Sequence, residues 1–322
     1  MRIKLSKCLC FIVLGLSAAL AAAQSYPERP IKIVQGFAAG GNADTIARVV
    51  SAEMGKSLGQ SFIVEAQTGA GGNIAAASVS RAKPDGYTLL LATGGHAVAG
   101  AVYKELSYKT VDDFEMISTV TYFPFLWVVR ADSPFKTLTQ VLAEARLKPN
   151  QLAYGTAGIG STHHLAGELL AKLSKTDLVH IPYRGDAASL TALLAGDVPM
   201  VVVPPTAALA NIKAGKLRAI AVTGPQRWPE MPEVPTVAEQ GVAGYDARSW
   251  AGFMAPAGVA RPIIERLNTE ILKALQQPVV RDRLKDMGGE AKGSTPEEMK
   301  TMVANELQRW SKLVTETNIP KQ

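Results

Sequence analysis

Four short segments that suit anion binding each stand just before an expected helix. They are Phe37-Ala38-Ala39-Gly40-Gly41 followed by Asp44, Thr93-Gly94-Gly95-His96, Thr156-Ala157-Gly158 followed by Gly160-Ser161-Thr162-His163, and Pro204-Pro205-Thr206. The first N–H groups of a helix have no internal partner, and the helix dipole makes that end partly positive. Small residues let a ligand approach the backbone, and the hydroxyl groups in these segments add donors. The segments therefore predict a site that binds a carboxylate or phosphate without a cationic side chain.

Any one of these segments has an ordinary structural explanation. Turns rich in glycine are common between strands and helices, and Ser and Thr are frequent N-cap residues. Two segments lie in each half of the chain, however, and ligands of open α/β sheets bind outside the carboxyl ends of the strands. We therefore expect the four segments to meet at one cleft.

Asp44 admits two interpretations. In the first helical turn after Gly40 and Gly41, a carboxylate is favoured by the helix dipole alone. It could equally accept hydrogen bonds within the cleft, from a water, a loop N–H group or a ligand ammonium.

The histidines and the known catalytic motifs give little support to metal or cofactor chemistry. His163 is expected to be a neutral donor to a ligand oxygen or a local cap, and His164 and His180 are expected to pack. The chain has no paired Cys/His spacing, no Gly-x-Ser-x-Gly motif and no phosphate-binding loop of the nucleotide hydrolases. Gly158-Ile159-Gly160 lacks the third glycine of a dinucleotide fingerprint. We therefore expect no metal, cofactor or catalytic residue; a hydrolase or transferase that uses Asp44 or His163 is the enzymatic alternative.

Strands alternating with helices predict an α/β fold with largely parallel sheets. Apolar residues recur at helical spacing over 43–58, and the chain from about Pro262 to Asn318 is expected to be nearly all helical. The expected strands are Pro30–Gly36, Ser61–Glu65, Tyr87–Ala92, Phe125–Arg130, Leu152–Thr156, Leu178–Pro182, Pro199–Val203 and Arg218–Thr223.

The amino-terminal residues predict export. Basic residues precede an apolar run that ends at Ala21-Ala22-Ala23, which is the pattern of a signal peptide covering 1–23. An uncleaved anchor is the alternative, although the run is shorter than the roughly 20 residues of a membrane span. Both cysteines, Cys8 and Cys10, lie in this segment, so the mature protein has neither disulfides nor thiolates for catalysis.

The charge of the mature chain is nearly balanced. The full chain carries 34 Lys and Arg, and removing three of them with the signal leaves 31 against 28 acidic residues. Because these charges are dispersed, nucleic-acid binding is not expected.

Blocks along the mature chain resemble the Bug family, the extracytoplasmic solute receptors of tripartite tricarboxylate transport systems. The first half is similar at Tyr26–Ile31, Phe37–Asp44, Gly69–Ile74 and Pro84–Leu90, and the second half at His164–Glu168, His180–Gly185, Ala214–Ala219, Val234–Glu239 and Ala255–Gly258. Three features depart from the common pattern: Gln35 stands where a strand-end proline is usual, His96 where smaller polar residues are usual, and Pro204-Pro205 is unusually rich in proline.

The resemblance implies a type II periplasmic-binding-protein fold with a cleft between two lobes. Lobe I would take 24–126 plus 253–322 and lobe II would take 127–252, with crossovers near Leu126–Arg130 and Trp250–Met254. The implied protein is a monomeric periplasmic receptor for a di- or tricarboxylate, an acidic amino acid or an aromatic acid. It would deliver this ligand to membrane permease subunits; a ligand-sensing subunit for a membrane sensor kinase is the alternative.

Overall fold

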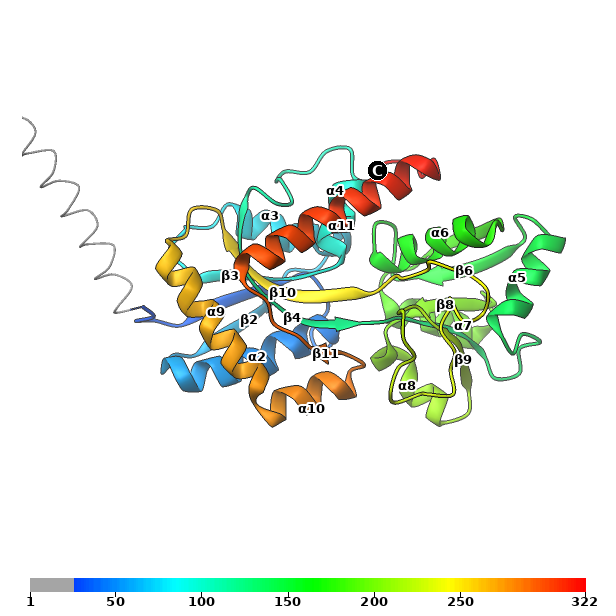
Figure 1. Cartoon of the computed structure of the whole chain (residues 1–322), viewed down its shortest axis with the longest axis horizontal. Helices are drawn as coiled ribbons and strands as arrows, with labels where there is room; N and C mark the ends of the chain where they lie inside the picture. The colour runs from blue at the N-terminus through cyan, green and yellow to red at the C-terminus, as the bar shows by residue number, and fades with distance from the viewer. Residues whose placement is uncertain (1–25) are drawn as a thin grey trace, which may run out of the picture.

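The computed structural model describes residues 26–322, so the expected signal peptide, with Cys8 and Cys10, lies outside the described residues. The described chain forms two lobes, each built on one β-sheet that is flanked by helices (Figure 1). No helix between 26 and 322 combines the length and the apolar character that a membrane crossing needs.

The first lobe contains a six-stranded sheet in the order β11-β4-β10-β3-β1-β2. Strands β1, β2 and β3 are parallel, and β10 pairs antiparallel with both β3 and β4. The bounds are β1 Ile31–Gln35, β2 Phe62–Ala66, β3 Thr88–Thr93, β4 Phe114–Phe123, β10 Ser249–Pro256 and β11 Glu290–Ala291.

The second lobe contains a five-stranded sheet in the order β7-β6-β8-β5-β9. Strand β6 pairs parallel with β7 and β8, whereas β5 runs antiparallel between β8 and β9. The bounds are β5 Leu126–Arg130, β6 Leu152–Thr156, β7 Leu178–Pro182, β8 Met200–Val203 and β9 Leu217–Val222.

Helices cover both faces of each sheet. In the first lobe β1-α2-β2 and β2-α3-β3 move in opposite directions across the sheet, so right-handed crossovers place α2 and α3 on opposite faces. Alternate β1 residues point accordingly: Ile31 and Ile33 pack with α2, and Val34 packs with α3. The helices are α2 Asn42–Leu58, α3 Asn73–Ser80, α4 Gly95–Val102, α5 Leu138–Leu147, α6 Thr162–Ser174, α7 Asp186–Ala195, α8 Pro205–Lys213, α9 Arg261–Gln276, α10 Pro278–Asp286 and α11 Pro296–Glu316, with a short 3₁₀ turn at Ala70–Gly72.

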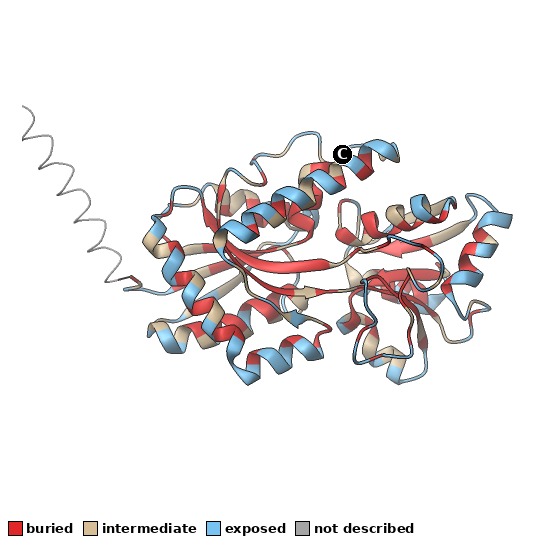
Figure 2. Ribbon diagram, viewed as in Figure 1, coloured by how far each residue is buried: buried red, intermediate tan, exposed pale blue. Residues whose placement is uncertain are grey.

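The chain passes between the lobes twice within the described residues. Only Pro124 and Phe125 separate β4 from β5, and 223–248 lead from β9 back to β10. The expected lobe boundary at 252/253 would cut β10, whose Ser249 already pairs with Phe123 in the first sheet. Figure 2 shows β4 and β10 buried along nearly their whole length, as expected for strands that lie in the middle of a sheet.

The connection at Pro124-Phe125 is packed and short. One apolar cluster continues from Phe123 through Phe125 to Trp127, and the rings of Phe123 and Phe125 meet edge to face with centroids 6.0 Å apart. The lobes are therefore joined by strands in contact with the core rather than by a flexible tether.

Candidate functional site

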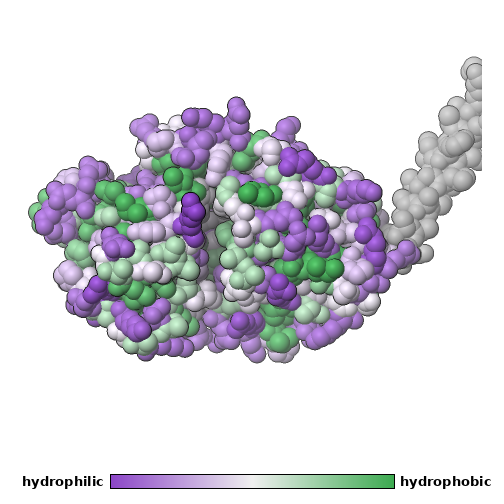
Figure 3. All heavy atoms as spheres, turned by 180° about the vertical axis from the view of Figure 1, so that it is seen from behind, coloured by the Kyte–Doolittle hydropathy of each residue, from purple (hydrophilic) through white to green (hydrophobic). Residues whose placement is uncertain are grey.

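The two sheets face each other with their carboxyl edges. Strands β1 and β3 of the first sheet end toward the second lobe, because β4, which runs parallel to β3, leaves the first lobe at Phe123. Strands β6 and β8 of the second sheet end toward the first lobe, because the antiparallel β5 enters there at Leu126. The helices that follow these strands consequently begin at the boundary between the lobes. Figure 3 shows a furrow along this boundary on the molecular surface.

Contacts across this boundary bring all four predicted segments together. The Thr206 hydroxyl donates to Oδ1 of Asn42 at 3.3 Å. A Cβ placed on Gly94 would lie 3.1 Å from Thr162 Oγ1, and one placed on Gly71 would lie 3.8 Å from the carbonyl oxygen of Gly160. The loops of the two lobes therefore meet along the boundary between the lobes.

Asp44 organises the first loop. Its carboxylate accepts from the Gly40 amide at 3.0 Å and from Nε and Nη2 of Arg48 at 2.9 and 3.1 Å. Hydrogen bonds from Arg48 lower the pKa of Asp44, although burial acts in the opposite direction. Of the two sequence interpretations, the one in which Asp44 accepts from a loop N–H group matches this geometry.

Gln35 explains why the loop tolerates the absence of a strand-end proline. The side chain is fully buried; its Oε1 accepts from the Phe37 amide at 2.8 Å, and its Nε2 donates to the Phe37 carbonyl at 2.9 Å. Gln35 thus fixes the turn after β1 by hydrogen bonds, where a proline would fix it through φ.

The amides of Gly40 and Gly41, which the sequence suggested as donors to a ligand, are already hydrogen-bonded within the loop. The Gly40 amide is bound to Asp44, and the Gly41 amide is bound to the Ala38 carbonyl at 3.1 Å. The amides of Asn42, Ala43 and Asp44 form the first turn of α2, which no side chain caps. These three amides are the donors that α2 presents, and Gly40 serves the turn through its φ of +77°.

The loop of the second lobe is held by its own side chains. Ser161 is the N-cap of α6: its hydroxyl accepts from the His164 amide at 3.2 Å and donates to the Gly158 carbonyl at 2.7 Å. Thr156 Oγ1 accepts from the Gly158 amide at 3.2 Å and lies 2.6 Å from His180 Nε2. Ser161 and Thr156 therefore shape the loop, and Thr162 and His163 carry the first amides of α6.

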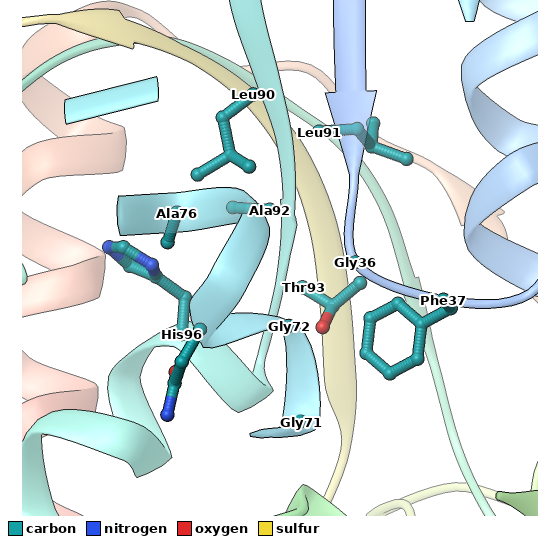
Figure 4. Close-up of a pocket in the computed structure, with 11 residues that line it drawn as sticks. Gly36, Phe37, Gly71, Gly72, Ala76, Leu90, Leu91, Ala92, Thr93 and His96 are labelled. Atoms are coloured by element: carbon teal, nitrogen blue, oxygen red, sulfur yellow. The ribbon is translucent and has the colours of Figure 1, made fainter. Parts of the chain in front are cut away.

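His96 lies behind the cleft. Nε2 is 2.8 Å from the Thr110 carbonyl, and the ring stacks on Tyr108 and meets Phe114 edge to face. Burial lowers the pKa of His96 to about 4, so the ring is neutral at pH 7. Figure 4 shows the ring turned away from Thr93 and Phe37. The expected contact between the His96 side chain and a ligand is thus not what this packing provides.

A cavity of about 20 Å³ lies beneath the first-lobe loops, lined by Gly36, Phe37, Gly72, Thr93 and other residues (Figure 4). This volume is close to that of one water molecule and far below that of an organic ligand. Asn73, whose Oδ1 accepts from the Tyr108 hydroxyl at 2.9 Å, also lines it. The cavity is therefore a small packing space beneath the loops and is too small to hold an organic ligand.

His163 faces Asp186 at the cleft edge of the second lobe. His163 Nε2 and Asp186 Oδ1 are 3.3 Å apart, without hydrogen-bond geometry. The imidazole lies against the Phe125 ring with centroids 4.1 Å apart. Burial lowers the pKa of His163 and raises that of Asp186, and the attraction between the two groups opposes both effects.

The structure also places the remaining predicted residues. Pro204 is the N-cap of α8, Pro205 occupies its first turn, and a Cβ on Gly288 would lie 2.7 Å from Pro205 Cγ, so this segment also meets the first lobe. Ala39 is exposed and Ala157 is half-buried in their loops. Within residues 26–322, no group of three or more His, Cys, Asp or Glu side chains is arranged to hold a metal ion.

Sequence reasoning missed three contributors to the cleft: Asn42, Asp186 and the loop Gly69–Gly72. Asn42 stands between Gly41 and Ala43 at the helix start, and Asp186 follows Gly185 at another helix start, so position at a βα turn was a usable signal for both. The loop stood only within the block Gly69–Ile74 that resembles the family, yet a Cβ placed on Gly71 would lie 3.8 Å from the carbonyl oxygen of Gly160 in the other lobe.

Comparison with known proteins gives a consistent result. A family model described as the tripartite tricarboxylate transporter family receptor matches residues 46–319. The protein BugT of Bordetella pertussis is 33% identical over 309 residues, which cover 95% of each chain. Among solved structures, Rpa4515 of R. palustris with adipate has a TM-score of 0.86 at 33% identity, covering 92% of this chain and 99% of that one. MatC from Rhodopseudomonas palustris with bound malate has a TM-score of 0.82 at 34% identity, covering 90% and 100%.

Proposed function

Because this chain belongs to the tripartite tricarboxylate transporter receptor family, we propose that it captures a small organic carboxylate between its two lobes. The captured ligand is handed to membrane permease subunits, and the protein works in the periplasm after its signal peptide is removed. The fold agrees with this role, since two-lobed receptors of this kind bind by closing around a ligand.

One observation carries the proposal: helix starts from both lobes meet at the boundary between the lobes, and each leaves first-turn N–H groups without an internal partner. The first turn of α2 offers the amides of Asn42, Ala43 and Asp44, and α6 offers those of Thr162 and His163. Helix starts of this kind bind carboxylates through N–H groups and the helix dipole. The side chain of Asn42 adds a buried Nδ2 that has no partner in the described chain, and buried donors are normally satisfied.

The bound states of two structural relatives support the class of ligand. Rpa4515 was solved with adipate and MatC with malate, both of them small dicarboxylates. Transfer of the carboxylate class to this chain rests on the shared fold and on sequence identities of 33% and 34%.

The enzymatic alternative would use Asp44 or His163. Asp44 is bound to Gly40, Arg48 and Gln35, and its pKa is lowered, which suits a structural anion better than a general base. Burial lowers the pKa of His163, and its ring has no nucleophile in hydrogen-bond contact among the described residues. A ligand recovered chemically unchanged after long incubation, as read by mass spectrometry, separates a receptor from an enzyme.

The decisive experiment removes one helix amide. Asn42→Pro removes both the side chain and the N–H group at the first position of α2, where proline fits a helix, and Gly41 already has the extended ψ of 179° that precedes proline. Asn42→Ala removes the side chain alone and is the matched control. A hydrogen bond to a charged group contributes about 1.5–3 kcal/mol, so Asn42→Pro should bind a carboxylate at least about tenfold more weakly than Asn42→Ala.

Calorimetry with a panel of mono-, di- and tricarboxylates measures this difference, and circular dichroism checks that both variants fold. Binding of no carboxylate by the wild-type protein would refute the proposed function. Equal affinities of the two Asn42 variants would show that the α2 amide is not a ligand donor.

A further inference from the structure

Two titratable side chains at the cleft edge of the second lobe are not used by the backbone clamp. His163 lies in the first turn of α6, and Asp186 is the first residue of α7. Strands β6, β7 and β8 run β7-β6-β8 across the sheet, so the crossovers through α6 and α7 move in opposite directions. Right-handed crossovers then place the two helices on opposite faces, as Figure 1 shows. The two side chains can meet only over the carboxyl edge of the sheet, which is the edge that lines the cleft.

The pair is close and incompletely bonded, with the His163 side chain 13% and the Asp186 side chain 32% exposed. The Nε2–Oδ1 separation is 3.3 Å, and both ring nitrogens of His163 and Oδ1 of Asp186 lack hydrogen-bond partners within residues 26–322. The Phe125 ring covers the imidazole at 4.1 Å between centroids. Buried polar atoms in native proteins are nearly always satisfied, so this cluster is built for a group that arrives from outside the chain.

The charges around His163 and Asp186 indicate which kind of ligand group the pair would bind. Asp186 makes no contact with Lys or Arg among the described ion pairs, and Arg184, two residues earlier, is exposed. A carboxylate at the start of α7 already occupies the position in which a ligand carboxylate would meet that helix dipole. A second carboxylate there would bring like charges together at a half-buried position, whereas an N–H or O–H donor would satisfy Oδ1.

We propose that His163 and Asp186 recognise the end of the ligand that lies away from the clamped carboxylate, and that they select an N–H or O–H donor there over a second carboxylate. The preferred ligand class is then a monocarboxylate with an ammonium or hydroxyl group at its far end. This inference rests on the proposed function, because it presupposes that the first-lobe loops hold the carboxylate.

The test compares ligands that differ only at the far end. Hexanoate, ω-hydroxyhexanoate, ω-aminohexanoate and adipate form one series, and butanoate, its ω-hydroxy and ω-amino derivatives and succinate form a shorter one. Calorimetry at pH 7.5 should rank an ω-amino or ω-hydroxy acid at least about tenfold above the dicarboxylate of equal length, a difference of about 1.4 kcal/mol. A larger effect for the ammonium than for the hydroxyl group would identify the cation as the preferred donor.

Variants connect the ranking to the pair. Asp186→Asn keeps the shape and removes the charge, so it should weaken ω-amino acid binding at least about tenfold and leave dicarboxylate binding equal or stronger. His163→Gln should alter the same ranking, whereas Arg184→Gln, which changes an exposed charge close by, should leave it intact. Thermal denaturation verifies that each variant folds.

The outcomes separate the two proposals. Wild-type protein that binds dicarboxylates as tightly as the donor-bearing acids overturns the inference and leaves the proposed function standing, and this result needs no variant. An unchanged ranking in Asp186→Asn also overturns it. Failure to bind any carboxylate, in these series or in the wider panel, overturns the proposed function itself.

Discussion

The Thr206 hydroxyl in the second lobe donates a 3.3 Å hydrogen bond to Oδ1 of Asn42 in the first lobe. This contact joins residues 164 positions apart in the chain and crosses the boundary between the lobes, so an opening of the lobes there would break it. It therefore belongs to the energy difference between the open and closed states, and ligand affinity depends on that difference.

Removal of this hydrogen bond should weaken ligand binding without destabilising either lobe. Thr206→Val keeps the shape and loses the donor, and a typical hydrogen bond contributes about 1 kcal/mol, so affinity should fall about fivefold. Calorimetry gives the affinity, and small-angle scattering reports a more open ligand-free protein. Thr206→Ser keeps the hydroxyl and is the control; an equal loss of affinity in both variants would mean that the hydrogen bond is not responsible.

Asp44 should matter to folding as well as to binding. Asp44→Asn keeps the size but loses the charge that Arg48 and the Gly40 amide stabilise, so the free energy of unfolding should fall by about 1–3 kcal/mol. The pKa of Asp44 is lowered in the folded protein, chiefly by hydrogen bonds from Arg48. This contribution is therefore complete above the unfolded pKa of about 3.9 and disappears as the pH falls through the folded value.

Urea denaturation at pH 7 and pH 3 tests the sign: the difference between wild type and Asp44→Asn should shrink at the lower pH. Arg48→Ala is an informative partner, because the Arg48 side chain is 56% exposed and the Gly40–Asp44 hydrogen bond would remain. It should cost less than Asp44→Asn and affect affinity little. A larger cost for Arg48→Ala would show that the ion pair, and not the loop contact, is the important interaction.

The absence of a side chain at Gly94 should be required for the two lobes to approach each other closely. Its φ of −51° is open to alanine, but a Cβ would lie 2.9 Å from Ser249 Oγ in its own lobe and 3.1 Å from Thr162 Oγ1 in the other. Gly94→Ala should therefore reduce both stability and ligand affinity. Adding Thr162→Ala should restore part of the affinity but none of the stability, as a double-mutant cycle measures. Restoration of neither would show that the contact within the first lobe accounts for the whole effect.

Much of the fold was predictable because its strands and helices carry strong local signals. The expected strands Leu152–Thr156 and Leu178–Pro182 are confirmed residue for residue. The start of α11 carries a local signal as well, since Thr295 caps it and forms a reciprocal capping box with Glu298. Both cases depend on neighbours in sequence, which is the information that periodicity and capping rules use.

The central strands of the first sheet were harder to predict. Strand β4 was not expected, because Ser118, Thr119 and Thr121 are buried in it and remove the alternation of apolar and polar residues. Strand β10 was expected only as a crossover near Trp250–Met254, and it pairs antiparallel with strands more than a hundred residues earlier. Such strands are specified by distant partners on both edges, which a local pattern does not contain.

The candidate site, like the fold, has features that the sequence predicts and features that it does not. The βα turns that face the cleft were identifiable from small residues before helices, but the partners within them were not. That the Gly40 amide is taken by Asp44, that His96 packs on Tyr108, and that Asp186 meets His163 all follow from tertiary packing. The donors and acceptors left for a ligand are those that remain after this packing, so they emerge only from the folded structure.

The histidines of the second lobe form a stacked pair that should make stability depend on pH. The rings of His164 and His180 lie 4.1 Å apart between centroids, and His180 Nε2 is 2.6 Å from Thr156 Oγ1. Burial lowers the pKa of His164 to about 4, and burial together with the neighbouring His164 lowers that of His180 to about 3. Glu168, which lies 3.7 Å from His164 Nε2, has a pKa raised by burial and acts in the opposite direction.

The unfolded chain holds these imidazoles near pKa 6.5, so below that pH it binds protons that the folded state does not. The free energy of unfolding should therefore fall as the pH decreases from 7 to 5. The slope is about 1.4 kcal/mol per pH unit for each histidine that is fully protonated in the unfolded chain and neutral in the folded protein. All four histidines of the chain are buried or nearly so, so exposed histidines do not contribute. His180→Gln keeps a hydrogen-bonding group and removes the titrating imidazole. The number of protons taken up on unfolding, which the slope of the unfolding free energy against pH reports, should then fall by close to one. Glu168→Gln should make the slope steeper, and a slope unchanged by His180→Gln in urea denaturation would show that His180 is protonated in the folded protein.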